Sequence, residues 1–457
     1  MPPVMKQDGR LVVVGGVAAG MSAASRARRL RPDIEIVVLE QGNDVSYGAC
    51  SLPYYISGVI SDRGDLIRYD AEFFRRERRI DVRLGARATR VDPRGRAVAF
   101  RSADGPEKTL DYDALVLATG ARPVRLPIPG SDLPGVFALR TLDDGDAVRR
   151  FLGDRAVERA TVVGAGYIGL EMAEALAVRG ASVTLLELLP TVLSTYDPDM
   201  SAIVERELLD RGIILHKETR VDAFEPRDEE PRVGYVVASG RRFAADLVLV
   251  SAGVRPATEL ASAAGIELGR TGAIRVDRRQ VTSEPTVLAA GDCAESPHVV
   301  TGRSTWIPLG TTANKHGRIA GENAVGGNVR FGGVAGTNAT KVFELEVAQT
   351  GLSTAAAGEA AIFADSVKIS STSRSHSYPG AAPLAVKLVF EKQSGRVLGA
   401  QIVGREGAAK RVDTVAAALH AGMTVAELAE IDMSYAPPFS PVWDPVLIAA
   451  SQALKKL

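Results

Sequence analysis

The chain has 457 residues. This is too long for one hydrophobic core, because single cores stop growing near roughly 250–300 residues, so about two to four domains are expected. A hydrophobic content of 46%, a charged content of 24% and 55 basic against 55 acidic residues argue against disorder and against a basic nucleic-acid-binding protein. The two cysteines, Cys50 and Cys293, stand too far apart for a disulfide framework or a paired zinc site. We therefore expect a cytoplasmic protein that acts on small molecules and holds no metal.

The first predicted element is a buried strand, LVVVG, which leads into the glycine turn GGVAAG and a helix beginning near Met21. A second apolar run, IEIVVLE, ends in Glu40. In dinucleotide-binding folds, glycines such as Gly15 and Gly20 let the backbone approach a pyrophosphate at a helix N-terminus, and an acid after the second strand binds a ribose. Val17 stands where the middle glycine of this fingerprint is usual. The segment predicts a first nucleotide site.

The same segment carries no charge from Leu11 to Ser25, as the apolar region of a signal peptide would. It is glycine-rich, too short to span a bilayer, and followed by the basic run RARRLR rather than a cleavage site. We expect neither a signal peptide nor a membrane partner.

The plan repeats in ATVVGAGYIGLEMAEAL, which has an intact glycine fingerprint, and in ASVTLLE, which ends in Glu187. The repeat extends further, because DYDALVLATGARP at residues 111–123 is echoed by AADLVLVSAGVRP at residues 244–256. Duplication at this depth predicts two dinucleotide-binding folds. Its glycines and one threonine are Gly164, Gly166, Gly169, Thr119, Gly120 and Gly253.

A third motif, PTVLAAGDCAE, places Gly291 and Asp292 directly after an apolar strand. A helical pattern, TTANKHGRIAGENAV, follows it. We interpret this segment as the return of the chain to the first nucleotide domain.

In their order along nearly the whole chain, these motifs resemble the flavin-dependent pyridine nucleotide–disulfide oxidoreductases. The resemblance implies an α/β fold with two Rossmann-like nucleotide-binding domains and a C-terminal α/β dimerisation domain. It places an FAD domain at residues 10–120 and 254–328, an NAD(P)H domain at residues 121–253, and the dimerisation domain at residues 331–457.

The resemblance also implies where the cofactors lie. FAD is expected on the first glycine turn, with Asp292 reaching its ribityl chain, and the nicotinamide nucleotide on the second, with Tyr167 as a gate over the flavin. The expected cofactor-binding residues are Gly15, Val17, Gly20, Glu40, Thr119, Gly120, Asp292, Gly164, Gly166, Tyr167, Gly169, Glu187 and Gly253.

Glu187 bears on the choice of nicotinamide. A carboxylate at this position binds a 2′-hydroxyl but repels a 2′-phosphate, and the residues after it, LLPT, include no arginine. We expect NADH to be preferred over NADPH.

Cys50 lies in SYGACSLPYY, soon after Glu40, where the family places its redox cysteine against the flavin. Branches with an internal disulfide have a second cysteine five positions later, but this chain has Tyr55 there. Cys50 is therefore expected to react with an outside sulfur, as a mixed disulfide or persulfide, or with oxygen, as a sulfenic acid. We expect Cys293 to be a packing residue.

The single-cysteine branch includes coenzyme A disulfide reductases, NADH peroxidases and oxidases, and persulfide or polysulfide reductases. Peroxidases and oxidases carry a histidine in the first glycine turn, where this chain has Ala18. The segments SHSYPGA and YAPPFSP are similar to two tyrosine segments of coenzyme A disulfide reductases, whose tyrosines reach the cysteine of the other subunit. Tyr378 and Tyr435 take those positions, and a phenol there can stabilise a leaving thiolate.

Coenzyme A carries several phosphate charges, so its site needs cations. Ser22, Arg26 and Arg29 share one face of the first helix, beside an apolar face of Ala23, Ala27 and Leu30. The resemblance places substrate ligands at Ser22, Arg26, Arg29, Ser46, Arg78 and His316. Trp443 stands where the type member has a lysine, which leaves room for a different thiol carrier.

The resulting prediction is a homodimeric enzyme with shared active sites that passes electrons from NADH through FAD to a Cys50 mixed disulfide. The expected substrate is coenzyme A disulfide, with Cys50, Tyr378 and Tyr435 as the catalytic residues. Two alternatives remain open from the sequence: a persulfide or polysulfide reductase or NADH oxidase of the same branch, and a flavin-bound redox sensor that reports through Cys50.

Overall fold

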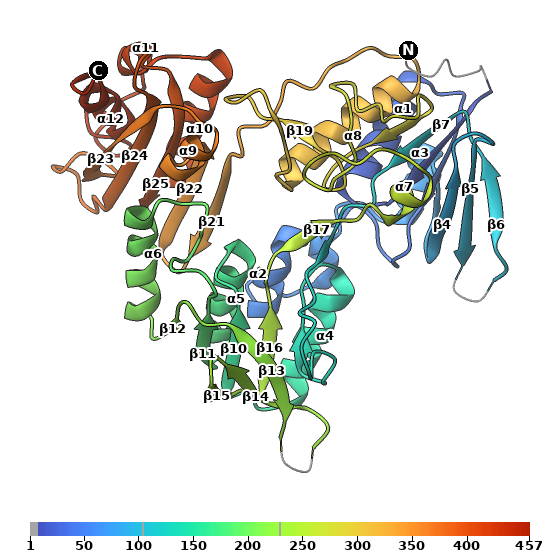
Figure 1. Cartoon of the computed structure of the whole chain (residues 1–457), viewed down its shortest axis with the longest axis horizontal. Helices are drawn as coiled ribbons and strands as arrows, with labels where there is room; N and C mark the ends of the chain where they lie inside the picture. The colour runs from blue at the N-terminus through green and yellow to red at the C-terminus, as the bar shows by residue number, and fades with distance from the viewer. Residues whose placement is uncertain (1–7, 103–104, 228–229) are drawn as a thin grey trace.

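The computed structural model describes residues 8–102, 105–227 and 230–457. The described chain is built around two five-stranded parallel sheets and one five-stranded antiparallel sheet (Figure 1). This arrangement confirms the predicted α/β class with two Rossmann-like folds and a C-terminal domain.

The first parallel sheet has the order β18–β7–β1–β2–β3. Its strands are β1 (Arg10–Val14), β2 (Glu35–Leu39), β3 (Asp81–Arg83), β7 (Ala114–Leu117) and β18 (Val287–Ala289). Alternate residues of β1 point to opposite faces: Leu11 and Val13 pack under helices, whereas Val12 and Val14 pack under a small antiparallel sheet. The helices are α1 (Ala18–Leu30), α3 (Ala71–Arg78) and α8 (Gly310–Ala324), and the small sheet comprises β4 (Ala86–Asp92), β5 (Ala97–Ser102) and β6 (Lys108–Asp111). Because β18 pairs with β7, the chain does return to this sheet as expected.

The second parallel sheet repeats the plan in the order β12–β11–β10–β16–β9. Its strands are β9 (Val136–Phe137), β10 (Arg159–Val163), β11 (Ser182–Leu186), β12 (Ile214–His216) and β16 (Leu247–Val250). Around it lie α4 (Leu142–Asp154), α5 (Tyr167–Val178), α6 (Pro198–Asp210), β13 (Val221–Pro226), β14 (Val233–Ala238) and β15 (Arg241–Ala244). The two crossovers predicted to echo each other pair directly, as β8 (Ala121–Pro123) against β17 (Val254–Pro256).

The C-terminal sheet is antiparallel, in the order β21–β22–β25–β24–β23. Its strands are β21 (Asn338–Val342), β22 (Leu345–Gly351), β23 (Ala364–Thr372), β24 (Pro383–Glu391) and β25 (Val397–Gly404). The accompanying helices are α9 (Thr354–Glu359), α10 (Ala408–Ala421), α11 (Val425–Ala429) and α12 (Pro445–Leu454). The remaining short elements are α7 (Glu259–Ala263), β19 (Ser296–Pro297) and β20 (Ser304–Thr305).

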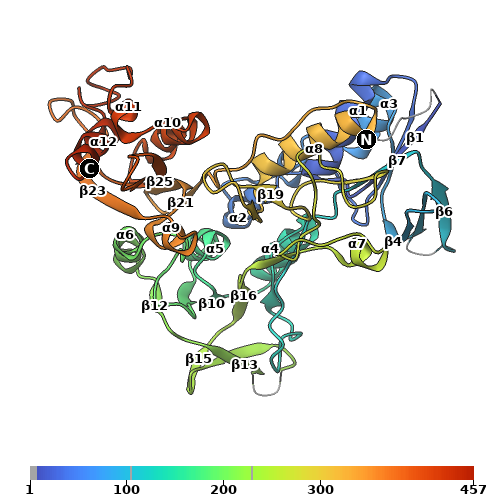
Figure 2. The same cartoon turned by 45° about the horizontal axis from the view of Figure 1, so that its top comes forward.

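One short helix, α2 (Leu52–Ser57), directly follows Cys50 and lies between the three sheets in both views (Figures 1 and 2). Its buried side chains Leu52, Tyr55 and Ile56 belong to the core formed by the second parallel sheet with α4 and α5. The segment that carries Cys50 therefore starts in the first nucleotide domain and is anchored by the second.

Over the described residues, no helix combines the length and hydropathy needed to cross a membrane.

Candidate functional site

The first glycine turn can be occupied only by glycine at its two ends. Gly15 has φ +105°, and a Cβ atom there would lie 2.2 Å from the Ala118 carbonyl oxygen. A Cβ on Gly20 would lie 1.8 Å from the Gly15 carbonyl oxygen. Helix α1 begins at Ala18, directly after Val17, and thus about one turn before the predicted start near Met21. No side chain caps this N-terminus, so its backbone N–H groups remain available to a pyrophosphate.

The second turn has the same construction. Gly164 has φ +99°, and its Cβ would lie 2.6 Å from the Ser251 carbonyl oxygen, the counterpart of Ala118. A Cβ on Gly169 would lie 1.9 Å from the Gly164 carbonyl oxygen. Helix α5 begins at Tyr167, and its N-cap residue, Gly166, likewise supplies no side-chain cap. Both turns therefore fit the dinucleotides expected of them.

The two acids are placed alike. Glu40 Oε2 accepts from Gly16 N at 2.6 Å and Oε1 accepts from Gly42 N at 2.7 Å. Glu187 Oε2 accepts from Ala165 N at 2.6 Å and Oε1 accepts from Leu189 N at 2.8 Å. Each carboxylate is thus fixed against its own glycine turn, where a dinucleotide ribose would lie.

The two crossover segments and the Gly-Asp segment carry the remaining residues expected to bind FAD or the nicotinamide nucleotide. Thr119 Oγ1 donates to the Ala257 carbonyl at 2.6 Å, and Ala257 N donates to the Gly120 carbonyl at 2.9 Å. Gly253, in the second crossover, has φ +96° and open space where a side chain would start. Asp292 forms an ion pair with Arg140, at 3.1 Å between Oδ2 and Nη2. Sequence reasoning missed Arg140, because it stands outside every motif.

Cys50 lies in a single 3₁₀ turn, Ala49–Ser51, and is exposed. The loop before it is tied to the first glycine turn, since Ser46 N donates to the Gly16 carbonyl at 3.0 Å with Ser46 at φ +53°. Cys293 is fully buried and contacts the Leu117 and Ala290 carbonyls, which confirms its predicted packing role. Cys50 is therefore the one accessible thiol among the described residues.

The charges around Cys50 oppose one another. Although the thiol is exposed, partial burial raises the pKa of Cys50, and the carboxylates of Glu171 and Asp292 raise it further, whereas Arg140 lowers it. Glu171 lies on α5, where its Oε1 accepts from Thr340 Oγ1 at 2.8 Å, and burial raises the pKa of this carboxyl. The pKa of Cys50 thus depends on charged residues from different segments of the chain, and Thr340 of the C-terminal domain holds one of them, Glu171.

Tyr55 occupies the position of a second redox cysteine, and its role is structural. The ring is buried, its hydroxyl donates to Asp146 Oδ1 at 2.9 Å, and the Arg149 guanidinium lies 4.2 Å from the ring centre. These contacts fix α2 against α4.

The predicted phosphate row on α1 is present but partly engaged. Ser22 Oγ lies 2.7 Å from Asn314 Oδ1, and Arg26 Nε donates to Glu322 Oε2 at 2.8 Å, because α8 lies alongside α1. Arg29 is exposed, and its pKa is lowered first by partial burial and then by the charges of Arg26, Arg78 and Arg318.

The row and its surroundings differ from the sequence prediction in three ways. Arg318, which joins the cluster around Arg29, was missed because nothing in the sequence places α8 beside α1. Leu30, expected on the apolar face, is 41% exposed because it lies at the last residue of α1, beyond α8.

His316 is the third difference. Its side chain is fully buried, with Nε2 3.1 Å from Ser296 Oγ and the ring packed edge-on against Phe331. Burial lowers the pKa of His316 to about 4, so the imidazole is neutral near physiological pH. The structure therefore offers His316 neither the exposure nor the charge of a phosphate ligand.

Tyr378 and Tyr435 are half exposed on the C-terminal domain. Their segments are brought together, because Ser375 N donates to the Pro437 carbonyl at 3.1 Å. The exposed side chains of Phe439, Val442 and Trp443 extend this surface. Within the described chain, no hydrogen bond joins either tyrosine to Cys50.

Tyr167 is the first residue of α5, directly after the second glycine turn. Its hydroxyl lies 3.3 Å from Thr195 Oγ1 and accepts from Gln349 Nε2 at 2.9 Å. Gln349 belongs to β22 of the C-terminal domain, and no sequence motif indicates this contact.

Two open glycine turns with fixed carboxylates, together with one accessible thiol among the described residues, are typical of a two-nucleotide oxidoreductase. The pyridine nucleotide-disulphide oxidoreductase family matches residues 9–317, and the dimerisation domain of that family matches residues 337–445. The chain belongs to this family, whose cofactors are FAD and NAD(P)H.

Relatives of named activity match nearly the whole chain. An "NAD(P)H sulfur oxidoreductase (CoA-dependent)" of Pyrococcus furiosus is 40% identical, over 96% of this chain and 98% of its own. An "NADH oxidase" of Methanocaldococcus jannaschii is 37% identical, over 98% and 99%. A "Coenzyme A disulfide reductase" of Staphylococcus aureus is 30% identical, over 94% and 96%. The solved structure of an NAD-dependent persulfide reductase from A. fulgidus is 40% identical with a TM-score of 0.94, over 98% of this chain and 83% of that one. This chain is thus an NAD(P)H-dependent flavoprotein oxidoreductase of the branch that these relatives represent.

Proposed function

We propose that the chain uses NADH to cleave a sulfur–sulfur bond carried by coenzyme A, with Cys50 as the attacking thiol. One observation carries this proposal: Cys50 is the one accessible thiol among the described residues, and no second cysteine stands near it to form an internal disulfide. Tyr55 occupies the position of that second cysteine and is buried against α4. A lone thiol must hold its partner covalently until electrons arrive.

The arginines near α1 support an anionic carrier. Arg26, Arg29, Arg78 and Arg318 lie close enough for their charges to interact, and only Arg26 of these has a salt bridge among the described residues. A chain of phosphates on this surface would relieve the mutual repulsion of the guanidinium groups. Ser22 and Ser46 would add hydrogen bonds, and Trp443, being exposed, offers a ring in place of a lysine.

Between the acceptors, we place coenzyme A persulfide first and coenzyme A disulfide second. The coenzyme A-dependent sulfur oxidoreductase of P. furiosus is 40% identical, against 30% for the coenzyme A disulfide reductase of S. aureus. This reverses the order expected from the sequence. Oxygen ranks third, because Ala18 stands where peroxidases and oxidases carry their histidine and offers no acid or base.

The chemistry of the chain's own residues follows. The Cys50 thiolate attacks the coenzyme A sulfur, which forms a Cys50–coenzyme A disulfide and breaks the original sulfur–sulfur bond. The leaving group is hydrosulfide from the persulfide or coenzyme A thiolate from the disulfide. Two-electron transfer from NADH is the chemistry that FAD supplies when bound. Reduction of the mixed disulfide returns the Cys50 thiolate and releases coenzyme A as a thiolate.

Several residues assist these steps. Arg140 favours the Cys50 thiolate, and Tyr167, directly after the second glycine turn, would cover a bound flavin. Tyr378 and Tyr435 of a second subunit would donate hydrogen bonds to the departing thiolate, which makes the enzyme a homodimer with shared sites. The exposed apolar surface around Phe439 and Trp443 is of the kind that subunits bury.

The test is steady-state oxidation of NADH by the holoenzyme with coenzyme A persulfide, coenzyme A disulfide, inorganic polysulfide or oxygen as the acceptor. The proposal predicts the highest kcat/KM for coenzyme A persulfide and loss of all sulfur-dependent activity in Cys50→Ser. An equal kcat/KM for inorganic polysulfide would remove coenzyme A from the proposal. No turnover with any acceptor would favour a redox sensor instead.

A further inference from the structure

A row of polar side chains crosses one face of the C-terminal sheet. Gln349 on β22 is the register partner of Gln401 on β25, Gln401 is the partner of Lys387 on β24, and Lys387 is the partner of Lys368 on β23. Directly opposed residues in a sheet share a face. We call Gln349, Gln401, Lys387 and Lys368 the polar row.

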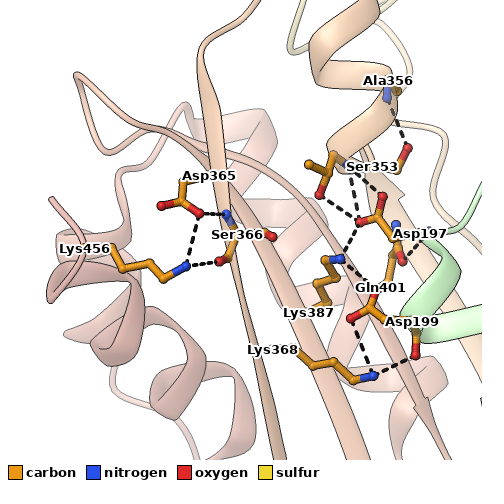
Figure 3. A network of polar contacts seen from close by, with 11 residues as sticks. Asp197, Asp199, Ser353, Ala356, Asp365, Ser366, Lys368, Lys387, Gln401 and Lys456 are labelled. Atoms are coloured by element: carbon orange, nitrogen blue, oxygen red, sulfur yellow. Dashed lines mark hydrogen bonds and ion pairs between the residues drawn. The ribbon is translucent and has the colours of Figure 1, made fainter.

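The polar row binds alternate residues of one segment in the NAD(P)H-binding part of the chain, and Figure 3 draws Gln401, Lys387 and Lys368 beside Asp197 and Asp199. Gln349 Nε2 donates to Thr195 Oγ1 at 3.1 Å, and Gln401 Oε1 accepts from Asp197 N at 3.0 Å. Lys387 Nζ lies 3.1 Å from Asp197 Oδ2 and 2.7 Å from Asp199 Oδ1. At the far end, Lys368 Nζ donates to the Asp199 carbonyl at 2.7 Å. The segment that leads into the first turn of α6 is therefore held against the sheet at every second residue.

The near end of the row reaches Tyr167. Gln349 Nε2 carries two protons, and it donates to Tyr167 Oη at 2.9 Å as well as to Thr195 Oγ1. A 3.3 Å contact between Tyr167 Oη and Thr195 Oγ1 closes the triangle. Burial raises the pKa of Tyr167, so the hydroxyl keeps its proton and can donate to Thr195 while it accepts from Gln349.

We propose that Gln349 is a positioning residue for Tyr167, whose amide pins the phenol hydroxyl and so sets how readily the ring leaves the mouth of the second glycine turn. The inference rests on the proposed gate role of Tyr167 and extends it, because it assigns control of the gate to the C-terminal domain. If the hydrogen bond from Gln349 to Tyr167 is lost, the ring moves more freely and a bound flavin becomes more accessible. A nicotinamide nucleotide then no longer has to break this hydrogen bond when it enters.

The experiment uses oxidised holoenzyme without NADH and measures iodide quenching of the bound flavin's fluorescence and calorimetric binding of NAD⁺. Gln349→Leu and Tyr167→Phe each remove one side of the contact. We expect both to increase iodide quenching and tighten NAD⁺ binding by up to about fivefold, the size of one hydrogen bond. The effect of the double variant should be smaller than the sum of the two single effects, because both substitutions remove the Gln349–Tyr167 hydrogen bond. Lys368→Met is the control, since it breaks the far end of the polar row without touching Tyr167.

Tyr167→Ala distinguishes a failure of the gate role of Tyr167 from a failure of the positioning role of Gln349. If it leaves iodide quenching unchanged, Tyr167 does not cover the flavin, and both the gate role and this inference are overturned. If Tyr167→Ala opens the flavin but Gln349→Leu and Tyr167→Phe do not, only the positioning role of Gln349 is overturned. A Lys368→Met effect as large as that of Gln349→Leu would mean general loosening between domains, which also overturns the specific role.

Discussion

Arg140 and Asp292 form an ion pair beside the accessible thiol, with Nη2 and Oδ2 3.1 Å apart. Partial burial raises the pKa of Cys50, Glu171 and Asp292 add to this, and Arg140 opposes them. The balance of these charges decides how much thiolate is available to attack a sulfur, because the thiolate is the nucleophile.

Two substitutions should therefore shift the pKa of Cys50 in opposite directions. Arg140→Leu removes a cation and leaves Asp292 unpaired, so the pKa rises; Glu171→Gln removes an anion, so the pKa falls. The measurement is the pH dependence of alkylation of Cys50 by iodoacetamide, mapped by peptide mass spectrometry. Buried Cys293 is the internal control and should not react. Shifts of the same sign in both variants would contradict this electrostatic picture.

The second prediction concerns the nicotinamide. Glu187 is held by Ala165 N and Leu189 N at the second glycine turn, so its charge faces any 2′-phosphate. NADH should have a higher kcat/KM than NADPH. Glu187→Gln should reduce the ratio of the two kcat/KM values by about tenfold, equivalent to ~1.4 kcal/mol.

Glu40 provides the matched control for Glu187, because its carboxylate makes the same two kinds of hydrogen bond at the first turn. Glu40→Gln should weaken FAD retention during dialysis and leave the NADH to NADPH ratio unchanged. Better use of NADPH than NADH by the unaltered enzyme would overturn the assignment to Glu187.

The polar row supplies a prediction about stability. Lys387 and Asp197 are nearly buried, with side chains 11% and 4% exposed, so Lys387→Met leaves a buried carboxylate without its cation. We expect a loss of about 3 kcal/mol in the free energy of unfolding, the usual cost of breaking such a pair. Lys368→Met, whose partner Asp199 is partly exposed, should cost less than about 1 kcal/mol. Urea denaturation measures both, and equal losses would show that burial does not govern this cluster.

The difference in the free energy of unfolding between the wild type and Lys387→Met should become smaller in acid. Burial alone would raise the pKa of Asp199, but its hydrogen bonds and charge interactions with Lys387 and Lys368 hold it below its ordinary value. A lowered folded pKa contributes stability above the unfolded value, and this is lost as the pH falls through the folded value. The gap should be constant near neutral pH and shrink below about pH 4. A gap that widens on acidification would contradict the sign.

Subunit exchange tests the shared site. Inactive Cys50→Ser subunits mixed with inactive subunits carrying both Tyr378→Phe and Tyr435→Phe should regain activity, because one of the two sites in a heterodimer receives every intact group. Exchange is verified by mass labelling of one parent. If labelled heterodimers form without recovering activity, the tyrosines do not act across subunits.

The nucleotide folds were predictable because their signals are local. Gly15 and Gly164 need positive φ angles, Gly20 and Gly169 leave no room for a Cβ atom, and each requirement leaves its own mark in the sequence. The duplication of the whole plan made each half support the other.

The surroundings of the thiol were not predictable in the same way. Arg140 reaches the thiol and Gln349 reaches Tyr167 from segments outside every motif. Glu171 lies within the second glycine segment, but the motif itself does not indicate that its carboxylate faces Cys50. Arg26 was expected to face a phosphate, but Glu322 already accepts from it, because α8 packs along α1. His316 lies on that same α8 with its ring turned into the core. Tertiary packing alone decides these partners.

The most direct test of the central claim is the mass of the Cys50 peptide in oxidised protein isolated without reductant. The account predicts a coenzyme A adduct on Cys50 that disappears on addition of NADH, and its retention should fall in Arg29→Ala, which loses a cation of the phosphate row. When reduced protein, in which Cys50 is a free thiol, is treated with coenzyme A persulfide, the adduct should form again and hydrosulfide should be released. A Cys50 peptide that gains only oxygen atoms under these conditions, or remains a free thiol after exposure to coenzyme A persulfide, would contradict it.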